Sequence, residues 1–222
     1  MKFLADHHSA QLCLRRQLHE AFAVAFVEKR IPTVTEITST TAPYLDAFLE
    51  ESLRHSNTLA ILTRQSTADT TILGHPIPKG TNVLMYTGGP SISRPIVPVP
   101  EFARSTSSKA SKDRVHDWDP EDTAAFEPQR WLTPNQDGAG DGEFRRVSFN
   151  LHAGPSLPFG AGPRGCFGRR LAYLELRVVV VLLVWNFEFE QCAPELSSYD
   201  GVDMLTTFPR QCFVKLRKLN NS

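Results

Sequence analysis

The sequence predicts an α+β protein that is mainly helical and carries small antiparallel β-sheets. Apolar residues recur at helical spacing over residues 9–29 and 42–55, which is typical of amphipathic helices. The apolar run VVVVLLVWNF at 178–187 is too short to cross a bilayer, so we expect it to form a buried helix. Short β-prone segments flank the turn sequence GHPIPKG, which indicates antiparallel pairing of the strands on either side.

The two N-terminal helices are predicted from their apolar stripes and end signals. The first repeats an apolar residue at every fourth position from Leu14 to Phe26. In the second, Thr41 is a candidate N-cap and Pro43 falls in the first turn, where proline costs no helical hydrogen bond. The intervening sequence RIPTVTEITSTTAP is expected to be a connector.

Two stretches of the chain predict loops. Residues 88–120 are rich in Gly, Pro and Ser, so we expect one long irregular surface loop there. The sequence TPNQDGAGDGEF at 133–144 predicts a second, polar loop. Beyond it we expect a helix that starts after Cys166 and ends at about residue 187, followed by a β-rich tail.

Composition and charge exclude several classes of protein. The chain has 24 Lys and Arg residues and 24 Asp and Glu residues, so no strong attraction to nucleic acid is implied. The first residues, MKFLADHHSAQ, lack the apolar core of a signal peptide. The four cysteines, Cys13, Cys166, Cys192 and Cys212, form no CxxC pair, which favours a reducing compartment over a disulfide scaffold.

The sequence PFGAGPRGCFGRRLAYLELR at 158–177 places Cys166 among four glycines at the start of the predicted helix. A buried structural thiol is the ordinary interpretation of a single cysteine. A cysteine nucleophile needs a histidine base, and no histidine spacing suggests one. Zinc needs three or four clustered ligands, which the sequence lacks. A haem-thiolate site needs only one cysteine as axial ligand, with basic residues such as Arg164 for the propionates, and the loop suits that need.

The segment FGAGPRGCFGRRLA resembles the F-x-x-G-x-R-x-C-x-G-x-x-x-A signature of the cytochrome P450 family. The resemblance implies that haem b is bound through the thiolate of Cys166, that Arg164 meets a haem propionate, and that Phe159 packs beside the cysteine loop. All six fixed positions of the signature are present: Phe159, Gly162, Arg164, Cys166, Gly168 and Ala172.

Two weaker motifs agree with this resemblance. Glu51 and Arg54 in ESLR are neighbours on one helix face, and Arg130 lies in FEPQRW. In the family such residues form a buried structural triad. The ordinary interpretation of the E-x-x-R pair is two solvated side chains, and that of FEPQRW is a turn that enters a helix or loop. Arg64 in ILTRQS occupies the strand position that in the family offers a second propionate contact, and its alternative is an exposed strand arginine. The segments NTLAIL and MLTTF correspond to family substrate-pocket walls, or to ordinary core packing.

The resemblance covers nearly all of residues 1–222 and only the family's C-terminal half, so we expect a partial cytochrome P450 domain. It implies a truncated haem-thiolate monooxygenase of the type found in fungal secondary metabolism. Such an enzyme inserts oxygen into a small lipophilic substrate, with electrons from NADPH-cytochrome P450 reductase.

The resemblance also defines what the chain is expected to lack. We expect no counterpart of the oxygen-activating distal helix or of the N-terminal membrane anchor. Full-length members reside at the endoplasmic reticulum membrane, whereas this chain as given would be cytoplasmic. Two alternatives stay open: a remnant that binds haem without monooxygenase activity, and a haem-free remnant with an interaction or structural role.

Overall fold

The computed structural model describes residues 1–56, 58–59, 61–89, 92–94, 97–112, 122–135, 147–154, 156–204 and 206–219. Within these ranges the protein combines helices with five two-stranded antiparallel sheets, as the sequence predicts. The α-helices are α1 (Lys2–Asp6), α2 (His8–Ala21), α3 (Ala23–Val27), α4 (Val34–Ser39), α5 (Pro43–Ser56), α6 (Thr106–Lys112) and α7 (Arg169–Asn186). Short 3-10 helices are η1 (Glu101–Ala103), η2 (Pro128–Trp131), η4 (Gly162–Arg164) and η5 (Pro194–Leu196).

Each sheet is a simple antiparallel pair of strands. Strand β1 (Ile61–Gln65) pairs with β4 (Asn82–Tyr86), with Arg64 opposite Val83. The strands β2 (Thr70–Ile72) and β3 (His75–Ile77) form the hairpin predicted around GHPIPKG. The remaining pairs are β5 (Leu132–Pro134) with β6 (Val147–Phe149), β7 (Phe187–Gln191) with β10 (Val214–Lys218), and β8 (Gly201–Asp203) with β9 (Thr207–Pro209).

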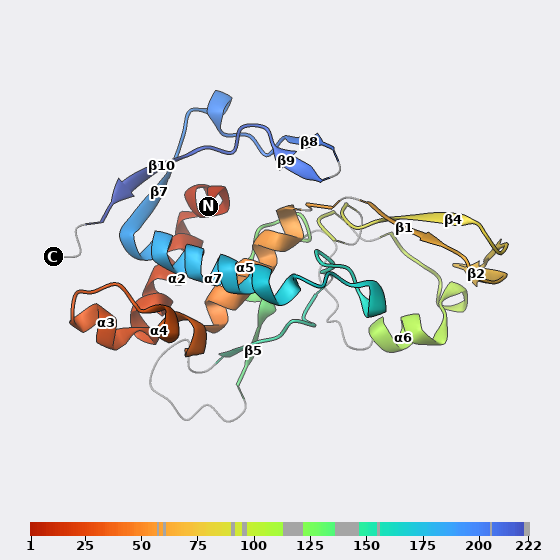
Figure 1. The fold of residues 1–222 in the computed structure, drawn as a ribbon, viewed down its shortest axis with the longest axis horizontal. Coiled ribbons are helices and arrows are strands. Elements are labelled where there is room, and N and C mark those ends of the chain that lie inside the picture. The colour runs from red at the N-terminus through yellow and green to blue at the C-terminus, as the bar shows by residue number, and fades with distance from the viewer. Residues whose placement is uncertain are drawn as a thin grey trace.

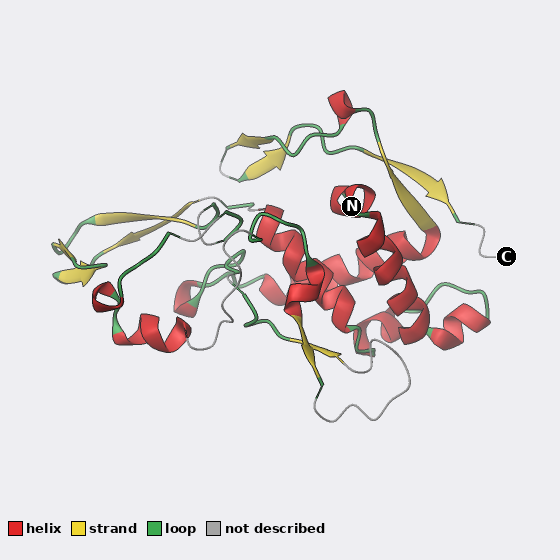
Figure 2. Cartoon of the chain, turned by 180° about the vertical axis from the view of Figure 1, so that it is seen from behind, coloured by secondary structure: helices red, strands yellow, loops and turns green. Residues whose placement is uncertain are grey.

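The main hydrophobic core lies among α2, α5 and α7. Their apolar stripes face one another, so side chains such as Leu14, Phe48 and Val181 are almost completely removed from solvent, which is the dominant favourable contribution to folding. Figures 1 and 2 show these helices gathered on one side of the molecule, while β1 to β4 extend away from them. Helix α5 therefore runs from the core towards the start of β1.

The predicted helix over 9–29 is interrupted. Helix α2 ends at Ala21, and Phe22 leaves the helical region with φ −113° and ψ 42° before α3 begins. The Phe22 side chain is buried, and its ring lies edge-on to Trp185 at 6.3 Å. The two helices thus share an apolar stripe but not one continuous axis.

The predicted connector between the first two helices contains a helix of its own, α4, so that part of the prediction is wrong. Thr33 and Glu36 form a capping box: the Glu36 amide donates to Thr33 Oγ1 at 3.2 Å, and the Thr33 amide donates to Glu36 Oε2 at 2.7 Å. This reciprocal pair satisfies two backbone donors that a short helix leaves open.

The prediction of one irregular surface loop over 88–120 is also wrong in part, because η1 and α6 form within it. Residues 101–112 contain no Gly or Pro, and the Ser108 amide donates to Ser105 Oγ at 3.2 Å, so a short helix can start. Residues 90–91, 95–96 and 113–120 lie outside the described residues, as does most of the second predicted loop.

The second helix and the long apolar helix are confirmed. Helix α5 begins at Pro43, and α7 buries Val180, Val181, Val184 and Trp185. In the part of the chain that the structure describes, no helix combines the length and apolarity needed to span a membrane.

Candidate functional site

The loop that precedes α7 folds tightly around Cys166. Gly160 and Gly162 adopt φ values of +68° and +69°, a left-handed conformation that favours glycine. These turns bring the chain back on itself, so that the Cys166 amide donates to the Phe159 carbonyl at 2.8 Å. We call residues 157–168 the cysteine loop.

Cys166 lies just before the start of α7 rather than inside it. The first helical residue is Arg169, with Gly168 as the N-cap residue. The Cys166 side chain is exposed and is a free thiol. A Cβ atom at Gly168 would lie 3.9 Å from the sulfur, which is an ordinary van der Waals distance.

A cavity of about 320 Å³ brings Cys166, Arg164 and Phe159 together. The opposite walls come from α5, β1 and the segment between them, and they are largely apolar. Phe159 also packs against α7, with its ring centroid 5.3 Å from that of Tyr173. The other lining residues are Leu53, Thr58, Leu59, Leu62, Thr87, Leu157, Pro158 and Gly160.

Arg64 does not line this cavity. It follows Leu62 by two positions on β1, so both project from the same face of the strand. Its Nη1 donates to the neighbouring Thr63 carbonyl at 2.9 Å. The predicted role of Arg64 at a propionate stays a prediction.

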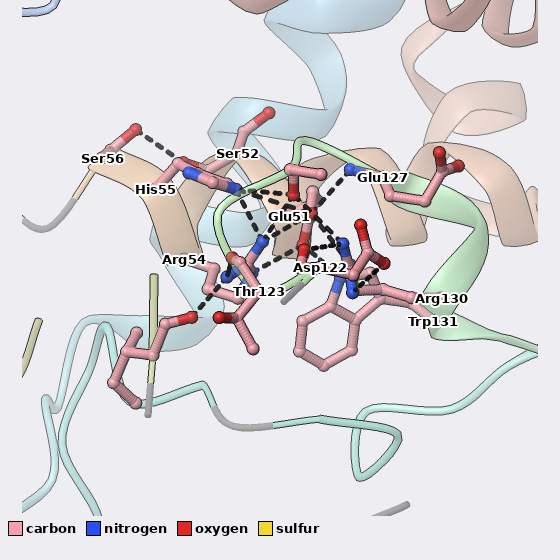
Figure 3. Close-up of polar contacts among 12 residues, drawn as sticks. Glu51, Ser52, Arg54, His55, Ser56, Asp122, Thr123, Glu127, Arg130 and Trp131 are labelled. Carbon is pink, nitrogen blue, oxygen red and sulfur yellow. Dashed lines mark hydrogen bonds and ion pairs between the residues drawn. The ribbon is translucent and has the colours of Figure 1, made fainter. Parts of the chain in front are cut away.

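Glu51, Arg54 and Arg130 meet in a buried cluster at one side of α5 (Figure 3). Glu51 is fully buried and Arg54 is 2% exposed. Arg54 donates from Nε to Glu51 Oε2 and from Nη2 to Glu51 Oε1, both at 2.8 Å. Arg130 Nε donates to Glu51 Oε1 at 3.2 Å. One carboxylate thus faces two guanidinium groups.

The rest of the cluster is built by backbone carbonyls and by two donors from the segment around η2. Arg54 also donates to the carbonyls of Thr123 at 2.7 Å and Ala125 at 3.0 Å. Trp131 Nε1 donates to Glu51 Oε2, and the Glu127 amide to Glu51 Oε1, each at 2.8 Å. Trp131 is the tryptophan of FEPQRW, but it is not among the site residues predicted from the sequence.

The electrostatics of the cluster favour an ionised Glu51. Burial disfavours the charged carboxylate, but hydrogen bonding by Arg54 and His55, the charge of Arg54 and the amide of Glu127 outweigh it and lower the pKa of Glu51 to about 2. The cluster therefore ties α5 to the segment 122–131 by charge-assisted hydrogen bonds. Because α5 also contributes Leu53 to the cavity, this tie fixes one of the cavity walls.

A different metal site finds no support among the described residues, where no group of three or more His, Cys, Asp or Glu side chains could hold an ion. The cysteine loop instead offers a single exposed sulfur beside a cation and an apolar cavity, which is the donor set of a haem-thiolate protein.

Comparisons with known proteins agree with this class. The family model for cytochrome P450 matches residues 2–92 and 118–215, and the chain belongs to the cytochrome P450 family. It is 41% identical over 97% of its length to the Hps1-dma1 cluster cytochrome P450 monooxygenase cyp3.1 of Dothistroma septosporum. It is 40% identical over 99% of its length to cytochrome P450 monooxygenase TRI13 of Fusarium sporotrichioides.

A third fungal relative, cytochrome P450 monooxygenase GME11363 of Pestalotiopsis microspora, is 37% identical over 97% of this chain. The resemblance to fungal members of the family is thereby confirmed. The chain spans 70% of the Dothistroma protein but only 38% of the Fusarium protein and 37% of the Pestalotiopsis protein.

Proposed function

We propose that residues 1–222 form the haem-binding, C-terminal half of a fungal cytochrome P450 monooxygenase fold, with the Cys166 thiolate as the axial ligand of the iron. The observation that carries this proposal is that Cys166, Arg164 and Phe159 line one cavity. The family match and the fungal relatives support it.

The residues around the cavity suit haem b. The macrocycle is a flat apolar disc, and leucines from α5 and β1 supply an apolar wall. The propionates need cations, and Arg164 makes no side-chain hydrogen bond or ion pair with the other described residues. A metal can reach the Cys166 sulfur because the side chain is exposed. Gly160 and Leu62 both line the cavity, and a Cβ atom added at Gly160 would lie 3.8 Å from Leu62 Cδ1. The absence of a side chain at Gly160 leaves this space open.

When bound, the haem iron supplies the reductive activation of O₂ and the insertion of one oxygen atom into a substrate. Cys166 would hold the iron, Arg164 would pair with a propionate, and Phe159 would shield the cysteine loop. By resemblance, the substrate is a small lipophilic secondary metabolite, the electrons come from NADPH-cytochrome P450 reductase, and the full-length enzyme resides at the endoplasmic reticulum membrane.

The proposal is tested by reconstituting the chain with haem and reducing it under carbon monoxide. We expect a strongly red-shifted Soret band in the wild type, its loss in Cys166→Ala, and its retention in Cys212→Ala, whose thiol is also exposed and free. A band that survives Cys166→Ala would contradict the ligand assignment.

The same sample separates the alternative functions. A wild-type chain without any such band would favour the haem-free remnant. With a band present, product formation in the presence of NADPH and the reductase separates a monooxygenase from a protein that only binds haem.

A further inference from the structure

A second buried carboxyl group lies next to Glu51 on α5 and is not part of the Glu51 cluster. Glu50 is 1% exposed. Its Oε1 accepts a hydrogen bond from the Ser156 hydroxyl, and its Oε2 accepts one from the Tyr173 hydroxyl. A buried carboxyl group without such partners would be strongly destabilising, so the two hydroxyls are integral to this site.

These two hydroxyls lie on either side of the cysteine loop. Ser156 comes immediately before the loop, and Tyr173 lies in the second turn of α7, which follows it. One side chain on α5 thus holds both ends of the loop that carries Cys166. Glu50 is itself fixed, because α5 is packed in the core and the neighbouring Glu51 accepts hydrogen bonds from the Glu127 amide and from Trp131.

Tyr173 extends this connection to the inside of the loop. Its ring packs against Phe159 with a centroid distance of 5.3 Å, and the Phe159 carbonyl accepts the hydrogen bond from the Cys166 amide. Burial and the neighbouring Glu50 raise the pKa of Tyr173, so its hydroxyl remains a proton donor at neutral pH. A continuous set of contacts therefore runs from Glu50 through Tyr173 and Phe159 to Cys166.

We propose that Glu50 is a positioning residue for Cys166, which fixes both ends of the cysteine loop so that the sulfur keeps its place at the cavity. The effect on the loop is independent of any ligand. The effect on iron ligation rests on the function proposed above, so the two are measured separately.

The first experiment uses the haem-free chain and amide hydrogen exchange of the cysteine loop. Tyr173→Phe removes one hydroxyl–carboxylate hydrogen bond, and we expect exchange of the loop amides to rise about tenfold. Tyr199→Phe is the matched control, because Tyr199 donates the same kind of hydrogen bond to Asp6 at 2.5 Å, away from the loop. Exchange in α2 reports on global stability and should stay unchanged in both variants.

Ser156→Ala tests the other end of the loop. If Tyr173→Phe does not fold, Ser156→Ala alone tests whether Glu50 fixes the cysteine loop. We expect it to increase loop exchange in the same direction. The inference is overturned if both variants exchange within about twofold of the wild type, if Tyr199→Phe has the same effect, or if α2 exchanges faster in parallel with the loop.

The second experiment uses the haem-loaded chain, reduced under carbon monoxide. In Tyr173→Phe and Ser156→Ala we expect part of the red-shifted Soret band to move to the less shifted position of an iron without thiolate, and no such change in Tyr199→Phe. An unchanged band in both loop variants would overturn the positioning role at iron. A wild type without the red-shifted band would contradict the proposed function alone, since hydrogen exchange still decides the role of Glu50 in the loop.

Discussion

Trp131 donates its indole N–H to Glu51 Oε2 at 2.8 Å, on the same oxygen that receives Arg54 Nε at 2.8 Å. The other oxygen, Oε1, accepts from Arg54 Nη2, from Arg130 Nε and from the Glu127 amide. Five hydrogen bonds thus converge on one buried carboxylate, and removal of Glu51 would break all five.

Replacing Glu51 by glutamine should therefore destabilise the fold strongly. Glu51→Gln removes the negative charge that faces the buried Arg54 guanidinium, while Arg130 keeps its ion pair with Asp122 at 3.2 Å. Breaking a buried ion pair from one side costs about 3–5 kcal/mol, and we expect that loss in the free energy of unfolding measured with urea.

The matched control for this substitution is Glu28→Gln, which breaks a surface ion pair with Arg30 at 2.6 Å. Exposed pairs contribute little, so the control should cost less than about 1 kcal/mol. Equal losses of unfolding free energy in the two variants would show that the buried ion pairs of Glu51 stabilise the fold no more than an exposed ion pair does.

The Glu51 cluster also predicts a dependence of stability on pH. The pKa of Glu51 is lowered in the fold to about 2 from its ordinary value of 4.5. A lowered pKa means that the stabilisation is fully present above about pH 4.5 and is lost as the pH falls towards 2. The difference in unfolding free energy between wild type and Glu51→Gln should therefore be smaller at pH 3 than at pH 6.

This comparison cancels the titration of other groups. Glu36, whose pKa is also lowered to about 2 by hydrogen bonds from Arg30 and Thr33, titrates in both proteins alike. A difference that is equal at pH 3 and pH 6 would contradict an ionised, paired Glu51.

The contacts of Glu51 could be anticipated in part from the sequence, because an E-x-x-R spacing places both side chains on one helix face. The hydrogen bond from Trp131 to Glu51 could not be predicted in the same way. Its N–H needs an acceptor only because the indole is fully buried, and that burial follows from the packing of η2 on α5.

The contacts of the cysteine loop could likewise be predicted from the sequence only in part. The turns at Gly160 and Gly162 follow from glycine-rich sequence, but the connection of Tyr173 to Glu50 joins residues 123 positions apart. Nothing in the dipeptide Glu50–Glu51 tells which carboxyl group faces which partner. By contrast, α4 was predictable, because Thr33 and Glu36 have the spacing of a capping box.

Replacing Trp131 by phenylalanine should destabilise the protein by about 1.5–3 kcal/mol, since the substitution removes a hydrogen bond to a charged group in a buried site. The measurement is the urea midpoint, with the m-value checked for constancy. In a Glu51→Gln background the same substitution should cost less, because its partner has lost its charge. Strict additivity of the two losses would mean that the indole stabilises the fold by packing alone.

Gly160 has φ +68° and lies at the cavity beside Cys166. Gly160→Ala should cost about 1–2 kcal/mol of stability because alanine is strained in the left-handed conformation. Its new methyl group would lie 3.8 Å from Leu62 Cδ1, in the space proposed for haem, so haem affinity measured by Soret titration should fall as well. Gly80→Ala is the matched control: φ there is +85°, and a Cβ would meet nothing within 4 Å. It should lose similar stability and bind haem as the wild type does, and equal haem affinities in all three proteins would contradict the proposed position of the macrocycle.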